Sequence, residues 1–426
     1  MKKIPWVILL LLISSFAAWA NDSPAPSAPA LTLEQCLKMA FLHHPEIVSS
    51  AWKVRRYESQ AQLAKSSARP TVALGATLSD SENAEARSAS DLTVKQLLTD
   101  GGKTRATIAG AAYDLSAARK DAERTWQERA FAVKEAFFNL LRTREDASVA
   151  IETVALYESQ LKQAQAFYRA GSSSKIDVTT AEVNLSQARL ELAKAESAAA
   201  SALAVLENEI GTALPDRKMP LEVPEERNGS IPSLETALGE ALSARVDVQA
   251  AEDRVLSAKA ALAAASAGMN PSLSLSGGWG FSDSSSGWED EWSAGLSLSV
   301  PLYDGGATAA RTEAARADLK IVQSDREKLI NSVRLEVETA LLDLETASQQ
   351  VKTAEAALRQ ARENLDLARG RYRVGVGTSL EVTDAAEKYS KAAKSLVQAR
   401  YDRQVAAAAL EKALGRTAGI PKEETK

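Results

Sequence analysis

The sequence predicts a mainly α-helical protein with a small β part, built twice from one plan. Three observations lead to this prediction: the 426-residue chain repeats itself in order, long segments carry an apolar heptad, and short segments alternate between apolar and polar residues. Only 5% of the residues are aromatic, which is few for a compact domain of this length. We therefore expect an extended molecule.

The internal repeat consists of short motifs that return at a nearly constant offset. Leu33 to Leu37 (LEQCL) returns 201 residues later as Leu234 to Leu238 (LETAL). The offset then grows to 204, at which Asp100-Gly101-Gly102 returns as Asp304-Gly305-Gly306. Such registers predict two structural repeats, at 31–215 and 233–415, joined by a breaker-rich segment at 216–232 that wraps the outside, with a tail at 416–426.

Each repeat is expected to contain a helix of about 36 residues, two short strands, a helix of about 66, a tight turn and a helix of about 38. Pro70 and Pro271 end the first helix of each repeat, and the Asp-Gly-Gly motifs open the long one. Gly171 and Gly375 mark the turns. By length, the two shorter helices of a repeat can stack end to end along the long one.

The second long helix carries a regular apolar seam with alternating spacings of four and three, which is the heptad of coiled-coil packing. Its residues are Val333, Val337, Ala340, Leu344, Ala347, Val351, Ala354, Leu358, Ala361, Leu365, Ala368 and Tyr372. Much of the seam is alanine, so we expect the paired helices to approach closely.

The strand segments of nine or ten residues alternate in the way of a sheet with one apolar and one polar face. The clearest are 71–79 and 292–300, whereas 91–98 is supported mainly by its duplicate. The residues predicted to face lipid are Leu273, Leu275, Trp292, Leu296 and Leu298. A soluble hairpin packed on the helices is the alternative, but secretion together with this alternation favours a membrane β-barrel.

The chain begins with the features of a secretory leader at 1–20: Lys2 and Lys3, an apolar run, and Ala18-Trp19-Ala20 before the expected cleavage site. An uncleaved anchor is the alternative, although the apolar run is shorter than a spanning helix of ~20 residues. A proline-rich linker follows at 21–30. After the leader we expect no transmembrane helix.

Composition argues against several classes of function. One cysteine, Cys36, and two adjacent histidines, His43 and His44, supply too few ligands for a metal cluster, and we expect no cofactor. The formal charge of −5 gives no support to a nucleic-acid surface. No convergent set of polar residues predicts an enzyme.

Four strands per chain imply an oligomer, because an open sheet edge in lipid leaves amide groups unpaired. Three copies would close a 12-stranded barrel with a hollow interior, since about eight strands are filled by side chains alone. Two or four copies remain possible on geometry. The helices would then form a tunnel below the barrel.

The duplicated plan, the two Asp-Gly-Gly motifs and the turns YRAGSSSKIDV and YRVGVGTSLEV resemble the TolC outer-membrane efflux family over residues 31–415. The resemblance implies a homotrimeric outer-membrane channel with a periplasmic helical tunnel. Such a channel is the exit duct of a tripartite efflux pump or a type I secretion system. Its partners would be a periplasmic adaptor, an inner-membrane pump and outer-membrane lipid, and the chain itself would not be an enzyme.

The resemblance also implies roles for the turns. Residues at the adaptor-contacting tip of the tunnel would be Tyr168, Arg169, Gly171, Tyr372, Arg373 and Gly375. A purely structural role is the alternative, in which the glycines allow a left-handed turn and the tyrosines end the seam.

Acidic residues beyond the turns, Asp177, Glu381 and Asp384, correspond to family positions that narrow the periplasmic entrance and favour cations. Ser174-x-x-Asp177 and Thr378-x-x-Glu381 are also capping boxes, so both roles stay open for these two acids. Thr180 occupies the place of Asp384 in the first repeat, and Gly377 stands where some relatives have a basic gating residue.

One rival function belongs to a different class, a periplasmic coiled-coil scaffold or adaptor without a membrane barrel. It predicts charged residues on both faces of the strands, which 272–281 and 292–300 do not have. Within the channel hypothesis the sequence does not select drug, metal ion or protein as the cargo.

Overall fold

The computed structural model describes residues 30–81, 84–214, 216–217, 219–224, 231–284 and 287–416. The predicted leader at 1–20, nearly all of the linker and nearly all of the tail lie outside these residues. Within the described part, none of the helices is long and apolar enough to cross a membrane.

The two halves contain the same elements in the same order, as the repeat predicts. The first half consists of α1 (Leu33–His43), α2 (Pro45–Ser66), β1 (Thr71–Ser81), β2 (Ala84–Thr99), α3 (Lys103–Arg169) and α4 (Lys175–Ile210). The second half consists of α5 (Leu234–Ala244), α6 (Val246–Ser266), a 3₁₀ turn (Ala267–Met269), β3 (Ser272–Ser284), β4 (Gly287–Ser299), α7 (Ala307–Arg373) and α8 (Ser379–Ala413). Both long helices begin directly after an Asp-Gly-Gly motif, as expected.

The prediction of one continuous first helix in each half is wrong, because each is broken after eleven residues. His44 ends α1 with an extended backbone and caps α2, accepting a hydrogen bond at Nδ1 from the Glu46 N–H (3.2 Å). Pro45 suits the first position of α2, where no intrahelical N–H bond is needed. Arg245 makes the corresponding break between α5 and α6.

Each break receives the end of the last helix of its half. Gly211 caps α4 at φ 78°, and a Cβ added there would lie 2.9 Å from the His44 Cα. Gly415 follows α8 at φ 72°, and its Cβ would lie 3.0 Å from the Arg245 Cα. The pseudo-symmetric contact therefore requires glycine for both its conformation and its small volume.

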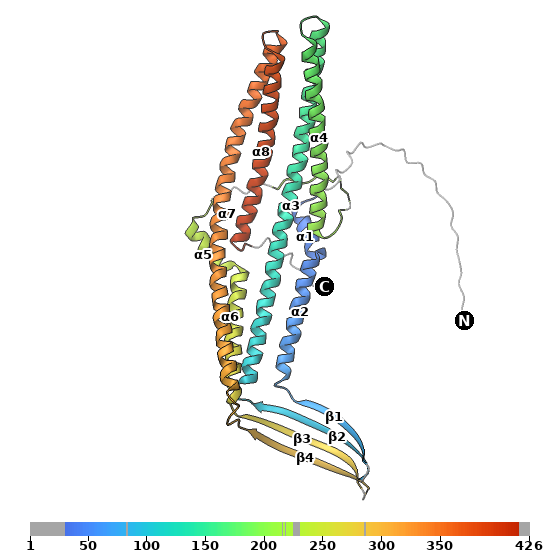
Figure 1. The fold of residues 1–426 in the computed structure, drawn as a ribbon, viewed down its shortest axis with the longest axis vertical. Helices are drawn as coiled ribbons and strands as arrows, with labels where there is room; N and C mark the ends of the chain where they lie inside the picture. Colours follow the sequence, from blue (N-terminus) through green and yellow to red (C-terminus); the bar gives the residue numbers. More distant parts are fainter. Residues whose placement is uncertain are drawn as a thin grey trace, which may run out of the picture.

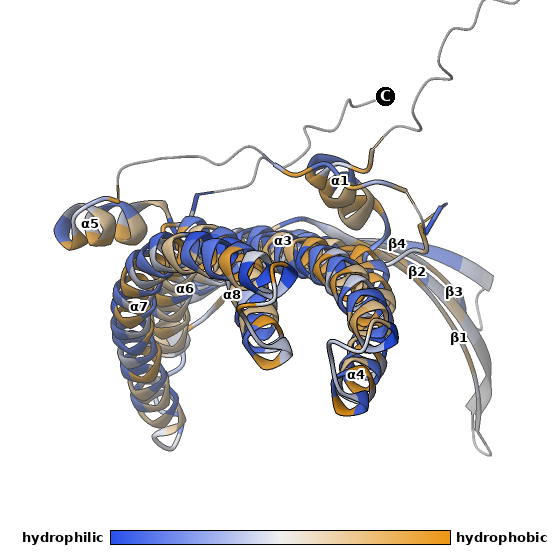
Figure 2. Ribbon diagram, turned by 90° about the horizontal axis from the view of Figure 1, so that it is seen from above, coloured by the Kyte–Doolittle hydropathy of each residue, from blue (hydrophilic) through white to orange (hydrophobic). Residues whose placement is uncertain are grey.

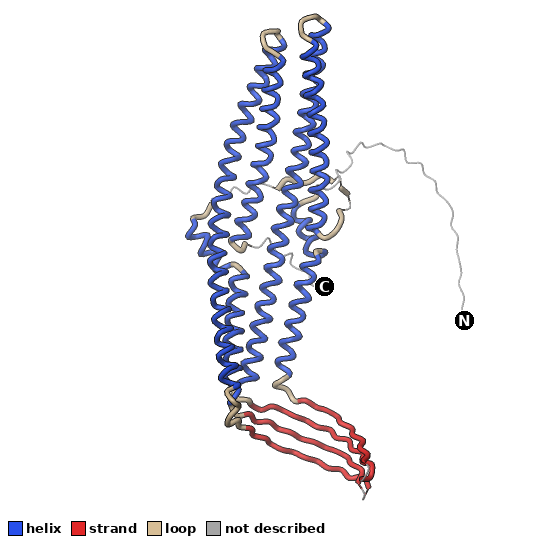
Figure 3. Tube along the Cα trace, viewed as in Figure 1, coloured by secondary structure: helices blue, strands red, loops and turns tan. Residues whose placement is uncertain are grey.

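The shorter helices stack along the long ones, as their lengths predict. Figure 1 shows α2 beside the half of α3 nearer the sheet and α4 beside the other half, with α6 and α8 following α7 in the same way. Figure 3 shows the result: a helical rod that carries all four strands at one end.

The predicted α7 seam forms the main interface of that helix. Eight of its twelve residues are buried, and Leu344, Ala354, Leu358 and Ala361 are partly buried.

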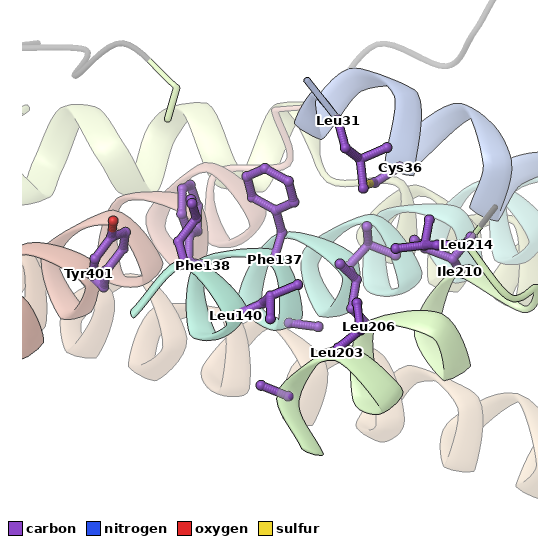
Figure 4. Close-up of a cluster of buried hydrophobic side chains, with 14 of the residues drawn as sticks. Leu31, Cys36, Phe137, Phe138, Leu140, Leu203, Leu206, Ile210, Leu214 and Tyr401 are labelled. Carbon is purple, nitrogen blue, oxygen red and sulfur yellow. The ribbon is translucent and has the colours of Figure 1, made fainter. Parts of the chain in front are cut away.

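A second core lies where α1 crosses α3 and α4, and in Figure 4 Leu31 and Cys36 lie above Phe137 and Leu206. Cys36 is fully buried, so it acts as the small apolar residue expected of a lone cysteine.

The four strands form one antiparallel sheet in the order β1-β2-β3-β4. They are longer than the nine or ten residues predicted, at 11, 16, 13 and 13 residues. The difference arises because the pairing continues into the hairpin tips, for example from Trp279–Trp292 to Ser284–Gly287, where Phe281 and Trp288 alternate with polar and charged residues. β1 and β4 each have one neighbour, so each presents an edge.

Viewed along the rod, the helices form a curved strip with α1 and α5 on its convex side (Figure 2). The connection between the halves pairs with the segment that precedes α1, through a parallel bridge between Leu31 and Leu221. The Arg144 guanidinium holds this segment by donating to the carbonyl oxygens of Met219 (2.8 Å) and Arg217 (3.1 Å).

Candidate functional site

The two helical turns lie side by side at the end of the rod opposite the sheet (Figure 1). α3 ends in a Schellman motif, in which the Ser172 N–H donates to the Phe167 carbonyl (2.9 Å) and the Gly171 N–H to the Tyr168 carbonyl (3.0 Å). The α7 turn repeats the pattern around Gly375. The two glycines have φ 72° and 79° with open space around them, so they serve the backbone conformation.

The two tyrosines that precede these turns occupy different surroundings. Tyr168 is 47% exposed, whereas Tyr372 is 6% exposed and packs edge-on against Phe167, with 5.2 Å between the ring centroids. Arg169 and Arg373 are exposed. Tyr372 is therefore the one predicted contact residue that is buried within the chain. Its ring packs against Phe167 and so joins the α7 turn to the end of α3.

The turns also carry an apolar surface that sequence reasoning missed. Ile176, Val374, Val376 and Leu380 are between 67% and 76% exposed. The available signal was that these large apolar residues fall outside the heptad seam, at positions where a solvated turn needs none. Because they lie beside Tyr168, Arg169 and Arg373 in the chain, the tip combines apolar and cationic groups.

Asp177 caps α4. Its carboxylate accepts hydrogen bonds from the Ser173 hydroxyl (2.6 Å), the Ser174 hydroxyl (3.1 Å) and the Ser174 N–H (3.2 Å). The Ser173 hydroxyl, followed by the Ser174 groups, lowers the pKa of this carboxyl. The predicted capping box at this turn is confirmed. The stabilisation is complete above the ordinary aspartate pKa and is lost as pH falls through the lowered value.

The acids of the second turn have other partners. Glu381 receives only half of a capping box: its N–H donates to the Thr378 hydroxyl (3.2 Å), while its carboxylate pairs with Arg371 (3.4 Å). Asp384 is exposed and pairs with Lys388 one turn along α8 (2.7 Å). The negative charge available from this turn is therefore partly offset.

At the other end of the rod, the sheet register brings the predicted lipid-facing residues together. Leu273 pairs with Leu298, Leu275 with Leu296, and Trp279 with Trp292. The same face continues across β2 and β1, where Leu92 pairs with both Trp279 and Leu74. These side chains alternate mainly with serine, threonine, glycine and alanine on the opposite face, which also carries Asp91, Lys95 and Glu291. One face of the sheet is therefore predominantly apolar, with Gln96 and Asp290 as polar members.

Nothing in the described part of the chain covers most of this apolar face. Trp292 is 78% exposed, and Leu296 and Leu298 are 64% and 65% exposed. A face of this size needs an apolar environment or a partner. Elsewhere in the described part of the chain, no three His, Cys, Asp or Glu side chains are grouped so as to hold a metal ion.

Comparison with known proteins gives a consistent result. The family model described as "Outer membrane efflux protein" matches residues 36–212 and 237–416. The chain is 26% identical over 393 residues to the outer membrane efflux protein BepC of Brucella suis, covering 90% of this chain and 85% of BepC. It is 27% identical over 340 residues to the protein CyaE of Bordetella pertussis, covering 76% and 70%.

Solved structures share the fold. The Campylobacter jejuni outer membrane channel CmeC superposes with a TM-score of 0.81 at 16% identity, covering 96% of this chain and 93% of CmeC. The open state of the Neisseria gonorrhoeae outer membrane channel MtrE gives a TM-score of 0.80 at 22% identity, covering 90% and 88%.

Proposed function

Because this chain belongs to the outer membrane efflux protein family, we propose that it is a homotrimeric channel subunit that passes cargo from the periplasm through the outer membrane. The single observation that supports this most directly is the uncovered apolar face of the sheet. The protein is an outer-membrane protein. The duct that it forms would serve a tripartite efflux pump or a type I secretion system.

The geometry of the sheet supports insertion as a closed barrel. From Leu298 to Trp288, where the residues of this face are apolar except for Asp290, there are ten residue steps. At ~3.4 Å per residue and a tilt of ~40° these cover roughly 25 Å, the height of an outer-membrane apolar band. Trp279, Phe281, Trp288 and Trp292 gather toward the hairpin end, in the place of an interfacial aromatic girdle. The polar face would line the lumen.

The two edges of the chain support closure by further copies. One edge consists of β1, α2 and α4, and the other of β4 and α7. Large apolar side chains are exposed along both, including Trp52 and Leu63 (each 70%) on α2, and Leu335 (67%) and Leu342 (57%) on α7. A head-to-tail contact between unlike edges generates a ring when the rotation closes, and three copies supply 12 strands.

The tip supports an interaction with other proteins. The exposed apolar residues Ile176, Val374, Val376 and Leu380, together with Arg169 and Arg373, offer a mixed apolar and cationic surface to a periplasmic adaptor that connects the duct to an inner-membrane pump. Asp384 would contribute one carboxylate per chain near the entrance. We propose transport without catalysis by this chain.

The rival function, a periplasmic coiled-coil scaffold, has weaker support. A soluble scaffold would keep in water a sheet face that exposes three tryptophans and several leucines, which is an aggregation hazard. The scaffold hypothesis also leaves both sheet edges open.

The deciding experiment is the oligomeric mass and heat-modifiable migration of the full-length protein extracted from outer-membrane fractions in mild detergent. We expect about 130 kDa, three chains of 45.4 kDa less their leaders. A soluble periplasmic monomer would overturn the proposal and favour the scaffold.

A further inference from the structure

A cavity of 790 Å³ lies midway along the helical rod, between α3, α4, α7 and α8. None of its lining residues comes from α1 or α5, the two helices on the convex side of the strip (Figure 2). Glu135 and Asn139, which line the cavity, lie on the face of α3 opposite Phe137 and Leu140, whose cluster includes residues of α1. The cavity therefore opens on the concave side. When the strips close into a ring, this side faces the lumen.

The base of the cavity is apolar. Phe138 and Tyr401 are 5% and 8% exposed, and small apolar residues surround them. The small apolar residues in the lining are Ala132, Ala136, Val205, Ala347, Val405, Ala406 and Ala409. Because the side chains are short, the volume remains open and the base is suited to a flat apolar group.

The rim of the cavity is negatively charged. Asp343, Asp402 and Glu135 are exposed at the rim, and among the described residues none of them forms an ion pair. Arg142, the lining's cation, is already engaged by Asp146 (3.6 Å) and by the Asn139 side chain (2.8 Å). The three carboxylates are thus left to attract a cation from the lumen.

We propose that this cavity binds amphipathic organic cations in the lumen, with the apolar part of the ligand on Phe138 and Tyr401 and its charge between Asp343 and Asp402. Neither feature suffices alone, since the carboxylates would also attract inorganic cations and the apolar base would admit neutral compounds. This inference rests on the proposed channel function and adds a cargo class to it.

The test measures block of the channel current in planar bilayers by ethidium, a flat organic cation, added from the side of the helical tip. For the double variant Asp343→Asn/Asp402→Asn we expect the half-blocking concentration to rise on the order of tenfold. The matched control is Asp366→Asn, which removes an exposed carboxylate of α7 outside the cavity. We expect ethidium to block this control channel at the same half-blocking concentration as the wild-type channel.

A second variant and a second probe keep the result decisive. Ala406→Phe fills the cavity and should weaken block by ethidium and by neutral N-phenylnaphthylamine, whereas the double carboxylate variant should affect ethidium alone. Equal ethidium block of the wild type, the double carboxylate variant and Ala406→Phe would overturn the inference. A wild-type channel that ethidium does not block would also overturn it, and this is the outcome expected if another copy covers the cavity. Failure of the wild-type protein to form a conducting oligomer would instead overturn the proposed function.

Discussion

At the scale of residues, the repeated motif at the two turns has different surroundings in its two copies. The same Tyr-Arg-x-Gly pattern places Tyr168 at the surface and Tyr372 against Phe167. The consequence is that one turn supports the other: the ring of Tyr372 fastens the α7–α8 hairpin to α3, while Tyr168 stays free to contact a partner.

The glycines at the helix breaks give a sharp prediction at this scale. Gly211→Ala should destabilise the protein by about 2 kcal/mol, because alanine is strained at φ 78° and its Cβ would collide with the backbone of His44. The control is Gly239→Ala within α5, where a Cβ meets nothing within 4 Å and helix propensity should improve. Urea unfolding in detergent measures both, and equal midpoints would refute the steric argument.

Asp384 supports a prediction about ion selectivity. Asp384→Asn should lower the cation preference of the channel in planar-bilayer recordings, since it removes a carboxylate near the entrance. Lys388 pairs with that carboxylate at 2.7 Å, so Lys388→Gln should shift the preference in the opposite direction. Unchanged selectivity in both variants would leave Asp384 a structural residue.

At the scale of elements, the sheet is organised by its register. Pairing Leu273 with Leu298 places the apolar residues of two strands on one face, and a slip of one residue would invert a whole strand. The many paired residues therefore disfavour a slip in register and keep the apolar residues on the face that the proposed barrel needs.

Leu296→Arg or Leu298→Arg should cost ~2–4 kcal/mol in a membrane environment and reduce the amount of oligomer in the outer membrane, because each side chain would face lipid near mid-strand. Ser297→Arg is the matched control, since Ser297 lies between them on the polar face. Immunodetection of the heat-modifiable oligomer in membrane fractions measures assembly. Normal assembly of both leucine variants would remove the barrel from the proposal.

The break between α5 and α6 is held by a buried charge cluster. Arg245 is 6% exposed and donates to Asp247 (2.8 Å), to Glu336 of α7 (2.7 Å) and to the Ala413 carbonyl at the end of α8 (3.1 Å). One side chain thus joins both parts of the broken helix to α7 and α8.

Arg245→Ala should destabilise the protein by about 3 kcal/mol or more, because Asp247 would remain buried with a partner lost. Arg416→Ala removes an ion pair of similar geometry, but this pair with Glu240 (2.6 Å) is exposed, so we expect at most ~1 kcal/mol. The comparison uses urea unfolding in detergent. Similar costs for the two arginines would show that the buried cluster has no special role.

At the scale of the whole molecule, the chain is a strip whose two edges differ, and this is the arrangement that permits a closed ring. Leu63 lies exposed on the α2 edge, next in sequence to Gln62, which is also exposed. Leu63→Glu should lower the melting temperature of the purified oligomer by several degrees, because it places a charge in the subunit contact. Gln62→Glu adds the same charge and should change the melting temperature little. Equal melting temperatures of the two variants would contradict the edge-to-edge contact.

Much of this architecture was determined by the sequence itself. The repeat, the starts and ends of the long helices, the α7 seam and the two-faced strands follow from local chemistry: proline and glycine at breaks, and apolar residues at periods of 3.5 and 2. The apolar face of β3 and β4 could be predicted residue by residue for the same reason. The resemblance to the efflux family then supplied candidate roles for the turns.

Other features were decided only by the tertiary structure, because they depend on contacts between residues far apart in the chain. The first helix breaks at His44 and Arg245 where Gly211 and Gly415 meet them from more than 160 residues away. Tyr372 is buried by Phe167 of the other repeat. The cavity midway along the rod is lined by four helices from both halves, and α3, α7 and α8 place alanine residues there at the same height. Local pattern determines which residues become helix or strand, whereas packing between the two repeats determines which side chains remain available for function.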